Sequence, residues 1–471
     1  MLTPCLKLAL RRLSFCAAAL VALCSHASAA EVKAWKAGTA VVKVTPTEPM
    51  WMAGYAGRKK PSEGVALDLY CKALALEDDA GRRVVFVTCD LIGIPRDLRE
   101  GVAGGVAEKY QLPPERLVLN ASHTHCGPEF RSYKKETLAL SDQRAQQGRA
   151  YFEKLQTQLI ALVGESIEKL APAKVSYVQA RCGFAMNRRT PSDAGYKNNP
   201  WSAGPVDHTV PVLKIAGTDD KLRAVLFGYA CHNTTLGFMQ FCGDYAGYAQ
   251  QYFEEKHPGV TAHFLMGCGG DQNPYPRGEL ELARHHGKTL GIAVEAALQS
   301  SPELKIEGTL TAGLEQAPLE FAPPPPKEIL ERQTKSPNEY EARHATRLLK
   351  ELADNGKIAV TYDAPLQAVQ LGDRLTIVAF PGETVIDFAL RAQRDLAGDK
   401  KQHIIWAAGY SNDVFAYIPS KRVLLEGGYE AGGAMLYGRF PGPFSVDVEE
   451  RMMKAATAAV ETARKEVATG E

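Results

Sequence analysis

The sequence has almost no net charge, no CxxC pair and, beyond its N-terminus, no long apolar run. Its 55 basic and 54 acidic residues leave a formal charge of +1, which excludes a general attraction for nucleic acid. No stretch after the first thirty residues approaches the roughly 18 apolar residues of a membrane span, so no transmembrane segment is expected in the mature chain. The lack of CxxC pairs argues against a zinc ribbon or a thioredoxin-type redox site.

The composition is that of a packed globular protein. Hydrophobic residues make up 45% and charged residues 23% of the 471 residues, which excludes a disordered chain or a disulfide scaffold. Cysteine is scarce after residue 30, and its odd count leaves at least one thiol unpaired within the chain. We expect mostly buried free thiols at Cys71, Cys89, Cys126, Cys182, Cys231, Cys242 and Cys268.

The first thirty residues have the pattern of a signal peptide. Basic residues precede an apolar stretch from Leu13 to Cys24, and Ala27-Ser28-Ala29 supplies the small residues of a cleavage site. We therefore expect a secreted or periplasmic protein whose mature chain, residues 31–471, is a single catalytic domain. The alternative is an uncleaved N-terminal anchor.

Short β-branched runs alternate with glycine-rich segments and helical stretches. This alternation predicts an α/β fold with mixed, largely parallel sheets flanked by helices. Residues 327–355 are charged and helical in character, and we interpret them as a helical excursion, either a lid or a solvated decoration. The predicted strands are Arg83–Thr88, Arg116–Ala121, Arg223–Ala230, Thr261–Met266, Leu375–Phe380 and His403–Ala408.

Polar side chains gather where these strands end. Ligands of α/β folds bind beyond the carboxyl ends of the strands, so the sequence predicts an active site there. The residues in question are Asp90, His123, His125, His232, Asp271, Glu383 and Asn412.

The histidines among them suggest a metal centre. His123 and His125 are two residues apart, so in an extended segment both rings project from one face. With His232 and Glu383 they offer the nitrogen and carboxylate ligands of a catalytic zinc site, in which zinc lowers the pKa of water to about 7. Histidines with a purely structural role are the alternative.

Several motifs resemble those of the neutral/alkaline non-lysosomal ceramidases. The run Asn120-Ala-Ser-His-Thr-His-Cys-Gly-Pro128 is similar to the metal motif of that family. Similar pieces follow in the family's order. They are Met52-Ala-Gly-Tyr-Ala56, Gly64–Leu76, Asn187-Arg188, Gly243–Tyr248, Pro381-Gly-Glu383 and the stretch from Asn412 to Gly438.

The resemblance implies a role for individual residues. It implies a Zn²⁺ ion held by His123, His232, Glu383 and Tyr417. It further implies that His125 transfers protons, that Tyr429 stabilises the oxyanion and that Arg188 contacts the substrate, although Arg188 could equally be a surface residue.

Two departures from the family pattern bear on activity. Asn273 stands where the ceramidases have a serine that is important for activity, and an amide can donate a hydrogen bond but cannot act as a nucleophile. About thirty residues follow Gly438, too few for the immunoglobulin-like domain of about 100 residues that usually follows in this family.

These observations predict an exported zinc hydrolase that cleaves an N-acyl amide bond of a ceramide-like lipid or similar small molecule. Asn273 could lie near the oxyanion in such an enzyme. One alternative is a hydrolase of the same fold that acts on a different soluble amide or ester. Another is a binding protein in which the metal has only a structural role.

Overall fold

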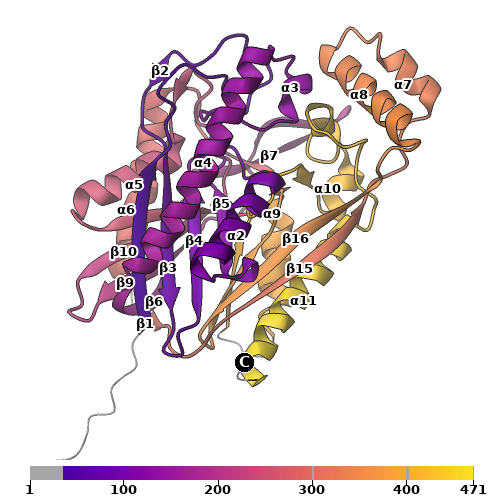
Figure 1. Cartoon of the computed structure of the whole chain (residues 1–471). Helices are drawn as coiled ribbons and strands as arrows, with labels where there is room; N and C mark the ends of the chain where they lie inside the picture. Colours follow the sequence, from indigo (N-terminus) through magenta and orange to yellow (C-terminus); the bar gives the residue numbers. More distant parts are fainter. Residues whose placement is uncertain (1–34, 300–301, 399–402, 470–471) are drawn as a thin grey trace, which may run out of the picture. The chain divides into compact units, whose positions relative to one another are not determined.

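The computed structural model describes residues 35–299, 302–398 and 403–469 (Figure 1). The predicted signal peptide, residues 1–30, lies outside these residues. The chain from Trp35 onward forms one compact unit.

The larger sheet has nine strands within the described residues. Its strands run in the spatial order β12-β10-β9-β6-β1-β3-β4-β5, and β14 pairs with β6. The bounds are β1 Trp35–Lys43, β3 Tyr70–Glu77, β4 Arg83–Cys89, β5 Leu117–Ala121, β6 Ala171–Arg181, β9 Thr209–Gly217, β10 Leu222–Tyr229, β12 Thr261–Met266 and β14 Leu304–Lys305.

A second sheet packs against one face of the first. Its order is β15-β16-β17-β19, with bounds β15 Leu310–Glu320, β16 Thr361–Leu371, β17 Leu375–Ala379 and β19 Ile404–Ala408. Alternation along the strands explains the packing, because successive side chains point to opposite faces. Leu74 and Phe86 point to the second sheet and meet Val369 and Ile377. Ala73 points the other way, toward helices.

Helices cover the two outer faces, so the unit has four layers, helix–sheet–sheet–helix (Figure 1). The helices α2 and α4 cover one half of the large sheet and α5 and α6 the other, while α9 and α11 cover the second sheet. Their bounds are α2 Arg96–Tyr110, α4 Asp142–Glu168, α5 Asp244–Lys256, α6 Leu280–Gln299, α9 Ile386–Asp395 and α11 Val448–Thr469.

This architecture confirms the mixed α/β class. The expectation that the sheets are largely parallel needs correction. Most neighbouring strands are antiparallel, because β1-β3-β4 and β6-β9-β10 follow one another along the chain without a crossover helix. The parallel pairs β4–β5, β10–β12 and β17–β19 are each linked by one helix, namely α2, α5 and α9. These three strand–helix–strand units are the ones that the sequence pattern predicts.

The excursion at 327–355 is helical, as expected. It consists of α7 (Lys327–Gln333) and α8 (Glu339–Asn355), which pack on each other through Leu330 and Leu348. Asn338 caps α8 by accepting a hydrogen bond from the backbone N–H of Tyr340. The pair projects from the sheets beside the glycine-rich segment that follows the short helix α10 (Lys421–Glu426) (Figure 1).

None of the described helices is long and apolar enough to cross a membrane.

Candidate metal centre and active site

The carboxyl ends of β5, β12 and β19 meet at one point, where a single buried amide joins them. The side chain of Asn120 accepts a hydrogen bond from the backbone N–H of Met266 at 2.8 Å. It donates to the carbonyl of Gly409 at 2.7 Å and to the hydroxyl of Ser411 at 3.1 Å. The two sheets are thereby held together directly beside the histidines.

His123 is held in a fixed tautomer just beyond β5. Its backbone lies in the left-handed region with φ of 60°, and its Nδ1 lies 2.6 Å from the carbonyl of Ile92. A carbonyl can only accept, so Nδ1 carries a proton, and in the neutral ring Nε2 has a free lone pair.

His232 is fixed in the same way beyond β10. Its Nδ1 donates to the carbonyl of Gly269 at 2.9 Å, and the hydroxyl of Tyr410 also lies 3.2 Å from this nitrogen. Its Nε2 faces the phenol oxygen of Tyr417 at 3.1 Å, and the two rings are parallel to within 2°.

Glu383 completes the group, and it follows β17 of the second sheet. It begins the short strand β18 (Glu383–Thr384), which pairs with β20 (Tyr417–Ile418) and sets the carboxylate next to Tyr417. Its Oε2 lies 3.1 Å from Nε2 of His123 and 3.4 Å from Nε2 of His232. When both rings are neutral, the lone pairs of these two nitrogens face the carboxylate, an arrangement that a cation would stabilise.

The protonation states suit a metal. Burial, reinforced by the charge of Arg188, lowers the pKa of His232 to about 3. Burial alone would raise the pKa of Glu383, but the facing imidazoles of His123 and His232 hold it well below its ordinary value. Neutral imidazoles and an ionised carboxylate are the forms that ligate divalent ions.

His125 lies beside this group and also faces the pocket. Its Nε2 is 3.1 Å from Nε2 of His123, and its Nδ1 is buried and has no hydrogen-bond partner among the described residues. Burial lowers the pKa of His125 well below its ordinary value, and the neighbouring imidazoles add to the effect. Gly54, with φ of 99°, lies against the ring so closely that a Cβ there would be 2.5 Å from Cγ of His125.

The donor set fits zinc. The nitrogens of His123, His125 and His232 form a cluster whose ligand atoms all lie within 4.8 Å of one another. The carboxylate of Glu383 and the phenol of Tyr417 complete a nitrogen and oxygen set of the kind that zinc accepts.

Arg188 is buried behind the proposed metal ligands rather than exposed. It lies on β7 (Ala185–Ser192) and donates to the phenol oxygen of Tyr417 at 3.0 Å and to Oε1 of Glu430 at 2.8 Å. Asn273, on β13 (Gln272–Pro274), accepts from the same guanidinium at 3.2 Å. Neither Arg188 nor Asn273 is among the described residues that line the pocket, and their roles toward a substrate stay predictions.

Asp271 and the glycine before it contact the segment that carries Glu383. Asp271 is buried and accepts hydrogen bonds from the backbone N–H of Ile386, at the start of α9, and from the side chain of Asn187. A Cβ on Gly270 would lie 2.6 Å from the carbonyl oxygen of Glu383. The loop therefore holds Glu383 in place.

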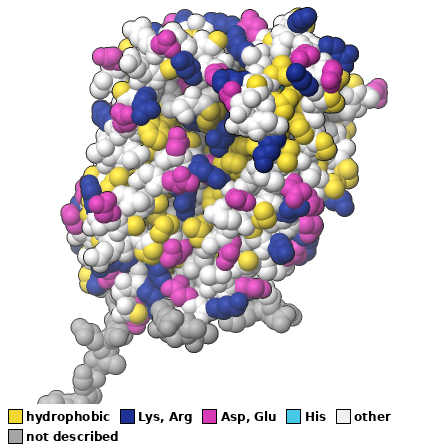
Figure 2. All heavy atoms as spheres, turned by 45° about the vertical axis from the view of Figure 1, so that its right-hand side comes forward, with side chains coloured by type: hydrophobic (Ala, Val, Ile, Leu, Met, Phe, Trp, Pro, Cys, Tyr) yellow, Lys and Arg dark blue, Asp and Glu magenta, His cyan; other side chains and the backbone are white. Residues whose placement is uncertain are grey.

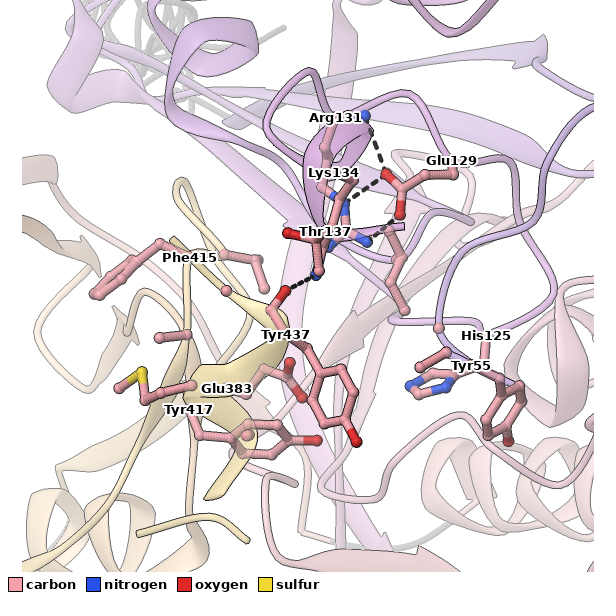
Figure 3. Close-up of a pocket in the computed structure, with 18 of the residues that line it drawn as sticks. Tyr55, His125, Glu129, Arg131, Lys134, Thr137, Glu383, Phe415, Tyr417 and Tyr437 are labelled. Atoms are coloured by element: carbon pink, nitrogen blue, oxygen red, sulfur yellow. Dashed lines mark hydrogen bonds and ion pairs between the residues drawn. The ribbon is translucent and has the colours of Figure 1, made fainter. Parts of the chain in front are cut away.

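A pocket of about 260 Å³ opens over the group. His123, His125, Glu383 and Tyr417 line its base, and the partly exposed Tyr429 lies at its wall. Figure 3 shows His125 and Glu383 on opposite sides of the pocket, with Tyr417 next to Glu383. On the face drawn in Figure 2, hydrophobic and basic side chains gather around a hollow in the upper half of the surface.

Comparison with known proteins identifies the family. A family profile described as neutral/alkaline non-lysosomal ceramidase, N-terminal, matches residues 35–281, just over half of the chain. The chain belongs to this ceramidase family. Neutral ceramidases of Drosophila pseudoobscura pseudoobscura and Drosophila melanogaster are similar to it, with 24% identity over 293 residues and 23% over 260 residues. These matches cover 57% and 50% of this chain but only 39% and 35% of the fly proteins.

Solved ceramidase structures share the fold. The structure of neutral ceramidase from Pseudomonas aeruginosa superposes with a TM-score of 0.70 at 18% identity, covering 91% of this chain and 75% of that one. A structure described as ceramidase complexed with C2 gives a TM-score of 0.71 at 17% identity, covering 92% and 75%. The resemblance read from the motifs is confirmed at the level of family and fold.

Sequence reasoning missed the residues that orient the ligands. The carbonyls of Ile92 and Gly269 carry no side-chain signal, and their role becomes visible only in the folded backbone. Glu430 lies within the quoted stretch from Asn412 to Gly438, and Tyr410 lies just before it. The position of these polar side chains close to proposed ligands in the sequence was the signal that could have identified them.

Proposed function

We propose that this protein is a zinc-dependent amidohydrolase of the ceramidase type, which cleaves the N-acyl bond of a lipid or similar acyl amide. The observation that supports it best is the convergence of two fixed imidazole lone pairs and the Glu383 carboxylate at the base of a pocket. In this proposal His123, His232, Glu383 and Tyr417 hold the ion. Zinc in such a site lowers the pKa of water to about 7 and polarises the carbonyl of the scissile amide.

The other predicted site residues would have separate roles in proton transfer, oxyanion stabilisation and support of the ligands. Because His125 is neutral, its imidazole can take a proton from the attacking water and deliver it to the leaving amine. The hydroxyl of Tyr429 can donate a hydrogen bond to the oxyanion, a contribution worth about 3 kcal/mol for one donor. Arg188 would fix the phenol oxygen of Tyr417, and Asn273 would hold the guanidinium of Arg188.

The test is hydrolysis of fluorescent N-acyl amides by the purified full chain, with and without a chelator. We expect activity that the chelator abolishes and added zinc restores. His123→Ala should lose both zinc and activity, whereas the exposed His285→Ala should keep both. Activity that survives complete removal of the metal would refute the zinc mechanism.

The replacement of the family serine by Asn273 supports a second candidate, a hydrolase of the same fold with a different soluble amide or ester as substrate. Its amide oxygen accepts from Arg188 and from Thr234, so it is tied into the buried scaffold. Comparing ceramide with short water-soluble amides and esters separates the two candidates.

We also propose that the protein is exported, with residues 31–471 as its mature catalytic domain. The support is the charge and hydropathy pattern of residues 1–30. N-terminal sequencing of the protein from cells that secrete it should begin near residue 31, and an intact N-terminus would contradict the proposal.

A further inference from the structure

The pocket above the histidines has two walls built from distant parts of the chain. One wall is the segment 129–138, which includes α3 (Lys134–Thr137). The other is the glycine-rich segment 429–438. Charged side chains line both walls, so their balance determines what the pocket attracts.

Two of the charged groups are already neutralised by partners. The carboxylate of Glu129 receives Nε and Nη2 of Arg131 at 2.8 and 2.5 Å, a two-pronged ion pair. The carboxylate of Glu430 receives Arg188 and Arg189 at 2.8 and 2.7 Å, and Arg189 also pairs with Glu426 at 3.1 Å. The acidic and basic groups balance in both clusters, so neither leaves a net charge for a ligand.

Lys134 has no such counter-charge. Its ammonium donates to the carbonyl of Tyr437 at 2.5 Å, across the pocket from one wall to the other, and in the described part of the chain it forms no ion pair with a carboxylate (Figure 3). Burial and the nearby charge of Arg131 lower the pKa of Lys134 to about 8. At neutral pH it therefore remains mostly an ammonium, and an ammonium has three N–H donors.

We propose that Lys134 binds an anionic group of the substrate, so that this pocket accepts an acyl amide that carries a carboxylate close to the scissile bond. The inference rests on the proposed amidohydrolase function and specifies its substrate class. An N-acyl amino acid has this chemistry, with the carboxylate on the amine portion. The pocket volume of about 260 Å³ lies just below the usual range of about 300–1,000 Å³ for ligand sites, which suits a compact polar head.

The first test compares two substrates with the same acyl chain, N-dodecanoylglycine and the neutral N-dodecanoylethanolamine. We expect wild-type kcat/KM to favour the glycine amide by about tenfold or more, as one charged hydrogen bond provides. Lys134→Gln should abolish this preference, because kcat/KM for the glycine amide should fall about tenfold more than kcat/KM for the neutral amide. Lys134→Arg keeps the charge and should keep the preference.

The matched control is Lys135→Gln, since Lys135 is exposed and pairs with Asp142. An equal loss of activity on both substrates in Lys134→Gln would mean that Lys134 only ties the two walls together, and would overturn the proposal. A wild-type enzyme that cleaves both amides equally well would overturn it too, without touching the amidohydrolase function.

A binding measurement keeps the inference testable if neither amide is cleaved. The probes are two non-hydrolysable thioethers, the anionic (dodecylthio)acetate and the neutral 2-(dodecylthio)ethanol, measured by calorimetry on the full chain as purified. We expect Lys134→Gln to weaken binding of the anionic thioether by about tenfold and to leave binding of the alcohol unchanged. Unchanged binding of the anionic thioether would overturn the subsite, whereas absent turnover with normal Lys134-dependent binding would count against the proposed function alone.

Discussion

Oε2 of Glu383 lies 3.1 Å from Nε2 of His123, although the two residues follow strands of different sheets. Glu383 lies just beyond β17 of the second sheet, on the short strand β18, whereas His123 follows β5 of the large sheet. Their contact brings two electron-rich atoms together in a largely buried place, and this is the arrangement from which the metal proposal derives.

Glu383→Gln should therefore cost the protein its metal. The amide keeps the size of the side chain but removes the negative charge that complements a divalent ion. We expect zinc affinity to fall by about tenfold or more, measured by elemental analysis after dialysis against graded chelator. The control is Glu255→Gln on the exposed face of α5, and undiminished zinc in Glu383→Gln would contradict the ligand assignment.

Gly54→Ala should impair catalysis without removing zinc. The new methyl group would lie 2.5 Å from Cγ of His125, and φ of 99° disfavours alanine in any case. Because the His125 ring must move, we expect kcat to fall by about 100-fold while elemental analysis still finds the metal. Gly57→Ala in the same loop meets no atom within 4 Å and should behave like wild type. Normal kcat in Gly54→Ala would argue against a catalytic role for His125.

Asp271→Ala should weaken metal binding from outside the ligand set. The change removes the acceptor for Ile386 and for Asn187, so the segment that carries Glu383 loses its support. Loss of such supporting bonds typically costs about 10–100-fold in metal affinity, which titration with a zinc indicator would measure. Asp354→Ala on α8 serves as the surface control, and an unchanged affinity in Asp271→Ala would refute the supporting role.

His263→Leu should make the fold less sensitive to acid. His263 is buried on β12, and burial together with the charge of Lys72 lowers its pKa to about 3. The unfolded chain binds this proton near pH 6.5, so folding stability is lost as pH falls from about 6.5 toward 3. Urea unfolding at pH 7.5 and pH 4.5 measures the free energy of unfolding of the variant and of wild type. The difference, variant minus wild type, should be about 2–3 kcal/mol more favourable at pH 4.5 than at pH 7.5. Parallel stability curves for the two proteins would contradict the assignment.

The sequence predicted the strands that bear the site better than the strands that do not. The runs ending at Cys89, Ala121, Tyr229, Met266, Ala379 and Ala408 are observed nearly as expected, because parallel strands joined by a helix show a clear change of periodicity. No helix joins the antiparallel strands β1, β3, β6, β15 and β16 to a parallel neighbour in the described sheets. Their omission made the sheets seem largely parallel.

The environment of individual site residues was less predictable. From the sequence, Arg188 could equally be a surface residue or a site residue. Only the fold shows that it is buried against Tyr417. Lys134 lies in a charged segment, Arg131 to Glu136, that looks like solvated surface. Its lack of a counter-charge depends on Glu129 being taken by Arg131, a matter of side-chain geometry that no spacing reveals.

The hydrogen bonds of Asn120 join β5, β12 and β19 directly beside the imidazoles, and the proposed ligands follow strands of both sheets. A divalent ion held there would cross-link the two sheets, which are the inner layers of the fold. Since such an ion binds only the folded protein, occupancy at a thousand times the Kd would add about 4 kcal/mol to the free energy of unfolding. Zinc supply would then set the melting temperature of this protein together with its turnover.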